Sequence, residues 1–151
     1  MKYNYLALAR ITSAGTLIYY AIEKIIDPVS FFKAIREYNL ISDELYPILN
    51  LVVSAIPITE ALAAFCLITG LWRRAAGIIV SGLIALFSIA ILLRTFNIMA
   101  EQNISFAEVE FDCGCGSGEV IIWQKIIMNI ALIVIILSSS LINRDAKVPT
   151  A

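Results

Sequence analysis

Apolar residues along this chain gather in four long runs that are separated by shorter polar stretches. A helix needs roughly 20 mainly apolar residues to cross a bilayer, and each run is long enough to do so. The pattern therefore predicts four transmembrane helices, at about residues 5–26, 46–71, 75–96 and 120–143. The remaining long polar stretch, about 97–119, is expected to be a loop.

The stretch between the first two runs, "DPVSFFKAIREYNL", has an amphipathic pattern of its own. Asp27 is a suitable N-cap residue, and Pro28 suits the first position of a helix. Four side chains then share one face: Phe31, Phe32, Ile35 and Tyr38. We expect a short helix at about 28–39, which either lies in the membrane interface or packs as a lid on the end of the bundle.

The composition supports an integral membrane protein. Of the 151 residues, 60% are hydrophobic and 15% are charged, whereas soluble domains have about 45–50% and about 25%. The mean hydropathy is +0.88. We therefore expect one all-α membrane domain over residues 1–151, a four-helix transmembrane bundle with a short interfacial helix in its first outer loop.

The absence of histidine narrows the possible chemistry. It excludes haem held by two histidines, zinc held by histidine, and catalytic dyads or triads that use histidine as the base. One Cys-x-Cys and one further cysteine also fall short of the four ligands of a zinc site. The sequence thus assigns no metal.

Charge asymmetry predicts how the helices are oriented. One side of the predicted membrane collects basic residues: Lys2, Arg73, Arg74, Arg144 and Lys147. Acidic residues dominate the two longer loops on the other side. The positive-inside rule then places both termini in the cytoplasm and the cysteine loop outside a bacterial inner membrane. A cleaved signal peptide is the alternative for the first run, but Arg10 within it and the lack of a clear A-x-A site argue against this.

Charged residues inside apolar spans require a partner or a function. Glu60 lies near the middle of the second run, and Arg10 is expected at a similar depth in the first. We expect an ion pair between Arg10 and Glu60, with a proton-relay or ligand-binding role for Glu60 as the alternative. Pro57, one turn earlier, is expected to kink the helix.

Three more charged residues, Glu23, Arg94 and Lys125, are expected near the outer ends of their helices. Snorkelling of their side chains to the membrane surface explains them without any function. Alternatively, all three line a pocket below the outer loop together with Trp123 and Asn97. Trp123 also suits the aromatic belt of a membrane interface.

The stretch "FDCGCGSGEV" holds Cys113 and Cys115. A disulfide between residues two apart requires a bent backbone and closes a small, strained ring. Such a bond would stabilise the fold little, yet it would be readily reduced. The alternatives are a soft-metal site for Cu(I) or Hg(II) and a loop without chemistry. Cys66 lies deep in the second run, too far away to be a third ligand.

The chain as a whole resembles the MauE/DoxX family of small, redox-associated bacterial membrane proteins. The resemblance rests on "FFKAIREYNL", on "PITEALAAFCLITGL" and on "CGCGSGEVIIWQKIIMNIALI", in this order and spacing. There is a looser similarity of architecture to DsbB and vitamin K epoxide reductase, which pass electrons from thiols to quinone. Those enzymes use two cysteine pairs, whereas this chain has one pair and the isolated Cys66.

The resemblance implies a thiol–disulfide oxidoreductase in which Cys113 and Cys115 are the reactive pair. Its implied partner is a thioredoxin-like protein outside the cytoplasm, and Glu60 is an acid typical of the family. Quinone is the candidate acceptor, in a pocket near Arg94, Trp123 and Lys125. We expect contact with membrane lipid and none with nucleic acid. A thiophilic metal carrier and a non-catalytic assembly subunit are the alternatives.

Overall fold

The computed structural model describes residues 2–38, 43–114 and 118–141 of the chain. Cys115 and the basic residues at positions 144 and 147 therefore lie outside the described residues. The elements follow in the order α1 (Lys2–Ile26), α2 (Pro28–Glu37), η1 (Asp43–Leu45), α3 (Tyr46–Thr69), α4 (Arg73–Gln102), η2 (Phe106–Glu108), β1 (Glu110–Asp112), β2 (Glu119–Ile121) and α5 (Ile122–Leu141).

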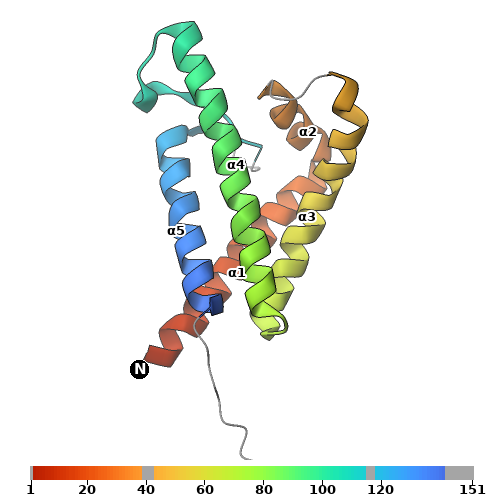
Figure 1. Cartoon of the computed structure of the whole chain (residues 1–151), viewed down its shortest axis with the longest axis vertical. Coiled ribbons are helices and arrows are strands. Elements are labelled where there is room, and N and C mark those ends of the chain that lie inside the picture. Colours follow the sequence, from red (N-terminus) through yellow and green to blue (C-terminus); the bar gives the residue numbers. More distant parts are fainter. Residues whose placement is uncertain (1, 39–42, 115–117, 142–151) are drawn as a thin grey trace, which may run out of the picture.

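The four long helices pack around a common core. α1 contacts α3 and α5, and α4 contacts the same two helices, so that the four close into a bundle. α1 crosses its neighbours obliquely (Figure 1). Its N-terminal end, the α3–α4 turn and the end of α5 lie at the lower end of the molecule, while α2 and the strands lie in its upper part (Figure 1).

Three described helices are long and apolar enough to cross a membrane: Pro47–Thr69, Arg73–Gln102 and Ile122–Leu141. They correspond to the second, third and fourth apolar runs. α1 corresponds to the first run, but it is not one of the three. Arg10 and a series of threonine, serine and tyrosine residues interrupt its apolar sequence.

The predicted short helix corresponds to α2, and its predicted start is confirmed. The backbone N–H of Ser30 donates a hydrogen bond to the Asp27 carboxylate at 3.0 Å, and Pro28 occupies the first turn. Phe31 and Ala34 of this helix are buried. They lie in the upper part of the bundle, where Phe31 joins a cluster with Leu49 and Val53 of α3.

The outer loop starts after Gln102, later than its predicted start at about residue 97. α4 does not end at Phe96 but continues for six residues to Gln102, because Ile98 still packs in the core on its buried face. Asn103 then ends the helix with a left-handed backbone (φ 52°), and its N–H bonds to the carbonyl of Met99.

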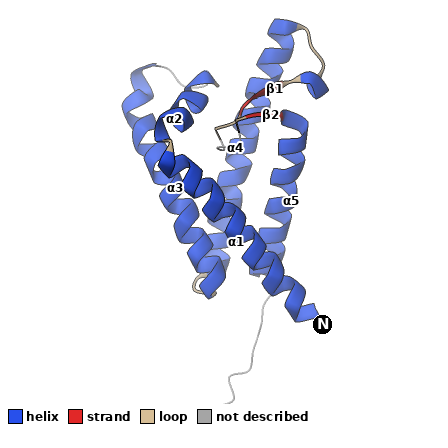
Figure 2. Cartoon of the chain, turned by 180° about the vertical axis from the view of Figure 1, so that it is seen from behind, coloured by secondary structure: helices blue, strands red, loops and turns tan. Residues whose placement is uncertain are grey.

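A short antiparallel hairpin, which the apolar pattern does not reveal, follows in this loop. Glu110 pairs with Ile121, and Asp112 pairs with Glu119 (Figure 2). Each strand has only three residues, so the alternation of side chains is too brief to be recognised in the sequence. The cysteine segment, residues 113–118, connects the two strands, and Cys113, Gly114 and Gly118 are its described residues.

Candidate functional site

Cys113 comes directly after β1 and is fully buried. It belongs to a cluster of buried residues from α4, α5 and the loop between them, together with Tyr38: Ile91, Ile98, Val109 and Ile122. The thiol of Cys113 is therefore enclosed by apolar side chains at the upper end of the bundle. In this conformation it is not accessible to a macromolecule in solution.

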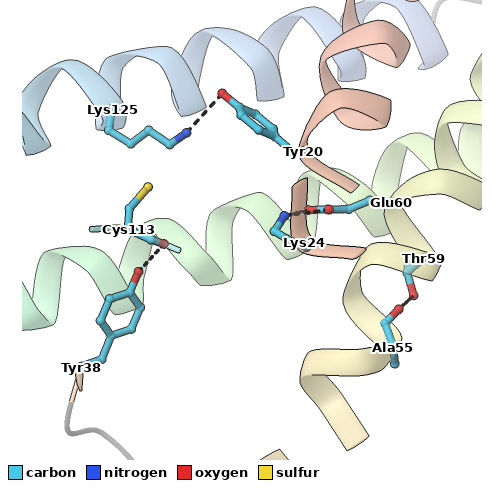
Figure 3. A network of polar contacts seen from close by, with 8 residues as sticks. All are labelled: Tyr20, Lys24, Tyr38, Ala55, Thr59, Glu60, Cys113 and Lys125. Carbon is cyan, nitrogen blue, oxygen red and sulfur yellow. Dashed lines mark hydrogen bonds and ion pairs between the residues drawn. The ribbon is translucent and has the colours of Figure 1, made fainter. Parts of the chain in front are cut away.

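Tyr38 holds the backbone of Cys113. Its hydroxyl group donates a hydrogen bond to the Cys113 carbonyl at 2.7 Å. The ring is buried, with 2% of its surface exposed, and it meets the Phe111 ring edge-on at 6.0 Å between centroids. Figure 3 shows that the sulfur of Cys113 points away from the tyrosine while the carbonyl points toward it.

Gly114 brings the cysteine segment against α2. Its φ of +69° is a conformation that suits glycine. A Cβ at this position would lie 3.1 Å from the Cβ of Ala34 and 3.2 Å from the Phe31 ring. The Gly114 N–H also donates a hydrogen bond to the Asp112 carboxylate at 2.8 Å. A side chain at position 114 would therefore push the segment away from α2.

Near the cysteine segment lies a buried group of charged residues (Figure 3). The Lys24 ammonium contacts both carboxylate oxygens of Glu60, at 2.6 and 2.7 Å. Only 6% and 7% of the two side chains are exposed. Lys125 is buried as well, and its Nζ lies 3.2 Å from the Tyr20 hydroxyl and 4.4 Å from the ring centroid.

Two cavities adjoin this charged group. The outer one, of about 150 Å³, is lined by acidic residues and by the glycines of the cysteine segment. The inner one, of about 30 Å³, lies among Glu60, Lys125 and Asn129. Lys24 and Gly114 line both cavities. The smaller volume suffices for a water molecule, which needs about 10–15 Å³ and polar partners.

The predicted ion pair between Arg10 and Glu60 is wrong, since Glu60 pairs with Lys24. The prediction assumed that α1 and α3 span the same depth. In the structure Lys24, in the last turn of α1, contacts Glu60 in the interior of α3, so the two helices are offset along the bundle. Arg10 is 14 residues before Lys24, about 21 Å along the helix. Its Nε is buried without a hydrogen-bond partner among the described residues.

Of the three residues of the predicted quinone pocket, Lys125 alone lines the inner cavity. Arg94 and Trp123 do not line it. Trp123 is 40% exposed on the first turn of α5, and Asn97 is exposed on α4. The residues that accompany Lys125 are instead Tyr20, Lys24 and Glu60.

Cys66 lies apart from the outer cysteine segment. It packs on the small-residue core in the lower half of the bundle, beside an apolar cavity that Trp72 and Ile79 also line. Cys113 belongs to a different cluster, at the opposite end. Within the described residues, no group of three cysteine, aspartate or glutamate side chains is placed to hold a metal ion.

Sequence reasoning missed Lys24, Tyr20 and Tyr38 as parts of this site. A signal for Lys24 exists in helical spacing. Ala14, Leu17, Ala21 and Lys24 are all buried and recur at intervals of three or four residues, so they lie on one face of α1. Glu23, which drew attention as the charged residue near the end of the run, lies on a different face.

Comparison with known proteins agrees with this architecture. A family model described as methylamine utilisation protein MauE matches residues 1–142. Neither a curated protein nor a solved structure matches the chain. The matched range includes all the described helices and the cysteine segment. The chain therefore belongs to the MauE family of membrane proteins.

Proposed function

We propose that this protein exchanges a disulfide between Cys113 and Cys115 with a thioredoxin-like protein outside the cytoplasm. The observation that carries the proposal is the structural support given to Cys113. A cysteine in an idle loop needs no particular position, whereas Cys113 is buried, its carbonyl is bonded to Tyr38, and its neighbour Gly114 fits against α2.

In this proposal the two cysteines have different roles, and the burial of Cys113 supports the distinction. A thiolate of the partner attacks the sulfur of Cys115, because Cys113 is enclosed. The Cys113–Cys115 bond breaks, Cys113 leaves as a thiolate, and a mixed disulfide forms between Cys115 and the partner. The second thiolate of the partner then attacks its own sulfur in this bond and releases Cys115. The partner loses two electrons and two protons, and the cysteine pair gains both.

In the proposed topology all four long helices, α1 included, cross a bacterial inner membrane. The N-terminus and the Arg73–Arg74 turn, which lie at the same end of the bundle (Figure 1), are cytoplasmic. The cysteine segment is then extracytoplasmic, where disulfides persist. Reoxidation of the pair requires a two-electron acceptor, and a membrane quinone is the candidate that resemblance to thiol-oxidising membrane proteins suggests.

A chromogenic thioredoxin tests the assignment. The probe is thioredoxin with a single active-site cysteine, carried as a mixed disulfide with thionitrobenzoate. In a Cys66→Ala background, the Cys113→Ser chain should form a disulfide with the probe and release thionitrobenzoate. The Cys115→Ser chain should react at least about tenfold more slowly, since its remaining thiol is buried. Equal rates would contradict the assigned order of attack.

A second experiment tests the function itself. The oxidised chain in nanodiscs should oxidise about one equivalent of reduced two-cysteine thioredoxin, and Cys66→Ala should do the same. Two results together would indicate an assembly subunit. One is that thioredoxin stays reduced, and the other is that the Cys113→Ser/Cys115→Ser chain replaces the parent chain fully in cells. Stoichiometric binding of Cu(I) that depends on Cys66 would indicate a metal carrier instead.

A further inference from the structure

We infer that Tyr38 is a positioning residue for Cys113, an inference that rests on the proposed function. Tyr38 directly follows the last residue of α2. Its hydroxyl group donates a hydrogen bond to the carbonyl of Cys113, which lies 75 residues later in the sequence. The bond is 2.7 Å long and buried. Because it acts on the backbone of the reactive residue, it restrains where the sulfur can lie.

Two further contacts restrain the same cysteine segment. The Phe111 ring, two residues before Cys113, packs edge-on against Tyr38. On the other side of Cys113, Gly114 lies close to Ala34 and Phe31 of α2. Tyr38 thus belongs to a three-point attachment between α2 and the segment, and its hydroxyl group is the polar member of that attachment.

The chemical consequence concerns the return step of the exchange. Once the partner is bound to Cys115, the Cys113 thiolate either attacks that bond again or remains apart from it. The rate of attack depends on how close the two sulfurs are held. Because the Tyr38 bond already restrains the Cys113 backbone, less conformational entropy is lost when the disulfide closes, and loss of the Tyr38 hydroxyl group should disfavour the disulfide form of the pair.

The test removes only the hydroxyl group. Tyr38→Phe keeps the ring and its contact with Phe111. In the chain that retains Cys113 as its single thiol (Cys66→Ala/Cys115→Ser), this change should accelerate alkylation of Cys113 by N-ethylmaleimide. We expect an increase of roughly threefold to tenfold, the range that the loss of one hydrogen bond produces. Tyr19→Phe, which alters a tyrosine that is 52% exposed on α1, is the matched control.

A thiol at the opposite end distinguishes local positioning from general loosening of the fold. In the Cys113→Ala/Cys115→Ser chain, Tyr38→Phe should leave the alkylation rate of Cys66 unchanged. In the chain with both outer cysteines, the same substitution should lower the equilibrium constant for forming the disulfide against glutathione by the factor seen in alkylation. A tenfold change corresponds to about 30 mV.

Two results would overturn the inference. One is an alkylation rate of Cys113 and a glutathione equilibrium that both stay within twofold of the parent chain. The other is an equal acceleration at Cys66, which would show that Tyr38 supports the fold as a whole. Failure of the proposed function would give a different result. The parent chain itself would then form no bond between Cys113 and Cys115 at equilibrium with glutathione, while the alkylation comparison would still report on Tyr38.

Discussion

Lys24 of α1 and Glu60 of α3 form a buried ion pair in which the ammonium touches both carboxylate oxygens, at 2.6 and 2.7 Å. The pair connects α1, the most polar of the four long helices, to a helix that is apolar enough to cross a membrane. Each charge is costly in such surroundings without the other. The pair therefore ties the last turn of α1 to the interior of α3.

We predict that Lys24→Met or Glu60→Leu alone destabilises the protein by about 3–5 kcal/mol, because each leaves an unpaired buried charge. The double variant should lose considerably less unfolding free energy than the sum of the two single losses. Arg10→Met is the control. When it is added to either single variant, the loss of unfolding free energy caused by that variant should stay the same. The measurement is the free energy of reversible unfolding in mixed micelles. Purely additive losses in the double variant would contradict a direct pair.

A glycine controls the approach of α4 to α5. A Cβ on Gly77 would lie 2.7 Å from the Cβ of Ser140. Gly77→Ala should therefore cost about 1–3 kcal/mol of unfolding free energy, the usual effect of overpacking. Ser140→Gly should recover most of that loss. Gly82→Ala on the same helix, where nothing lies within 4 Å of the new Cβ, should be neutral or stabilising.

If Gly77→Ala and Gly82→Ala had the same effect on the unfolding free energy, the close contact between α4 and α5 would be refuted. The pair of variants is informative because both replace a glycine inside one helix. They differ in what the added methyl group meets.

The helices could be predicted from the sequence because long apolar runs have few alternatives in a membrane protein. The cap of α2 was equally predictable, since Asp27 and Pro28 are strong local signals. The partner of Glu60 was not. It depends on the vertical offset between α1 and α3, which arises from tertiary packing and leaves no local trace in either segment.

The site beneath the cysteines was predictable only in part. Cys113 stood out by residue type, and the spacing of buried residues could have indicated Lys24. The link from Tyr38 to Cys113 joins residues far apart in the chain. It depends on a hairpin of three-residue strands that no periodicity reveals.

Two glycines with the same backbone provide a matched test of the contact between α2 and the cysteine segment. Gly114 and Gly118 have φ values of +69° and +68°. Alanine at either position incurs the left-handed strain, about 1–2 kcal/mol. Only at Gly114 would the methyl group also meet Ala34 and Phe31. Gly114→Ala should therefore accelerate alkylation of Cys113 more than Gly118→Ala does, whereas equal rates would argue against the contact.

The cap of α2 should give the attachment a pH dependence. The Ser30 backbone N–H bonded to Asp27 holds the pKa of that carboxyl below its usual value. A lowered pKa in the folded state means that ionised Asp27 stabilises α2 at pH values above the usual pKa of about 3.9. This contribution is lost as the pH falls through the lower, folded-state pKa. The protection of the α2 amides against hydrogen exchange, taken relative to the intrinsic exchange rate at each pH, should therefore fall in acid.

Asp27→Asn is the control for this prediction. Asparagine also caps helices, so α2 should persist in the variant at neutral pH. It does not ionise, so the acid-induced loss of protection attributable to the cap should disappear. An acid-induced change of the same size in the Asp27→Asn chain would assign the effect to another carboxyl group.

The Lys24–Glu60 pair has a consequence for biogenesis. In the proposed topology, in which α1 also crosses the membrane, α1 is synthesised before α3, so Lys24 reaches the bilayer before Glu60 does. A lysine without its partner is costly to insert, and the rest of α1 is only moderately apolar. The first helix made should thus be the last to settle firmly in the membrane, waiting near its surface until α3 supplies the countercharge.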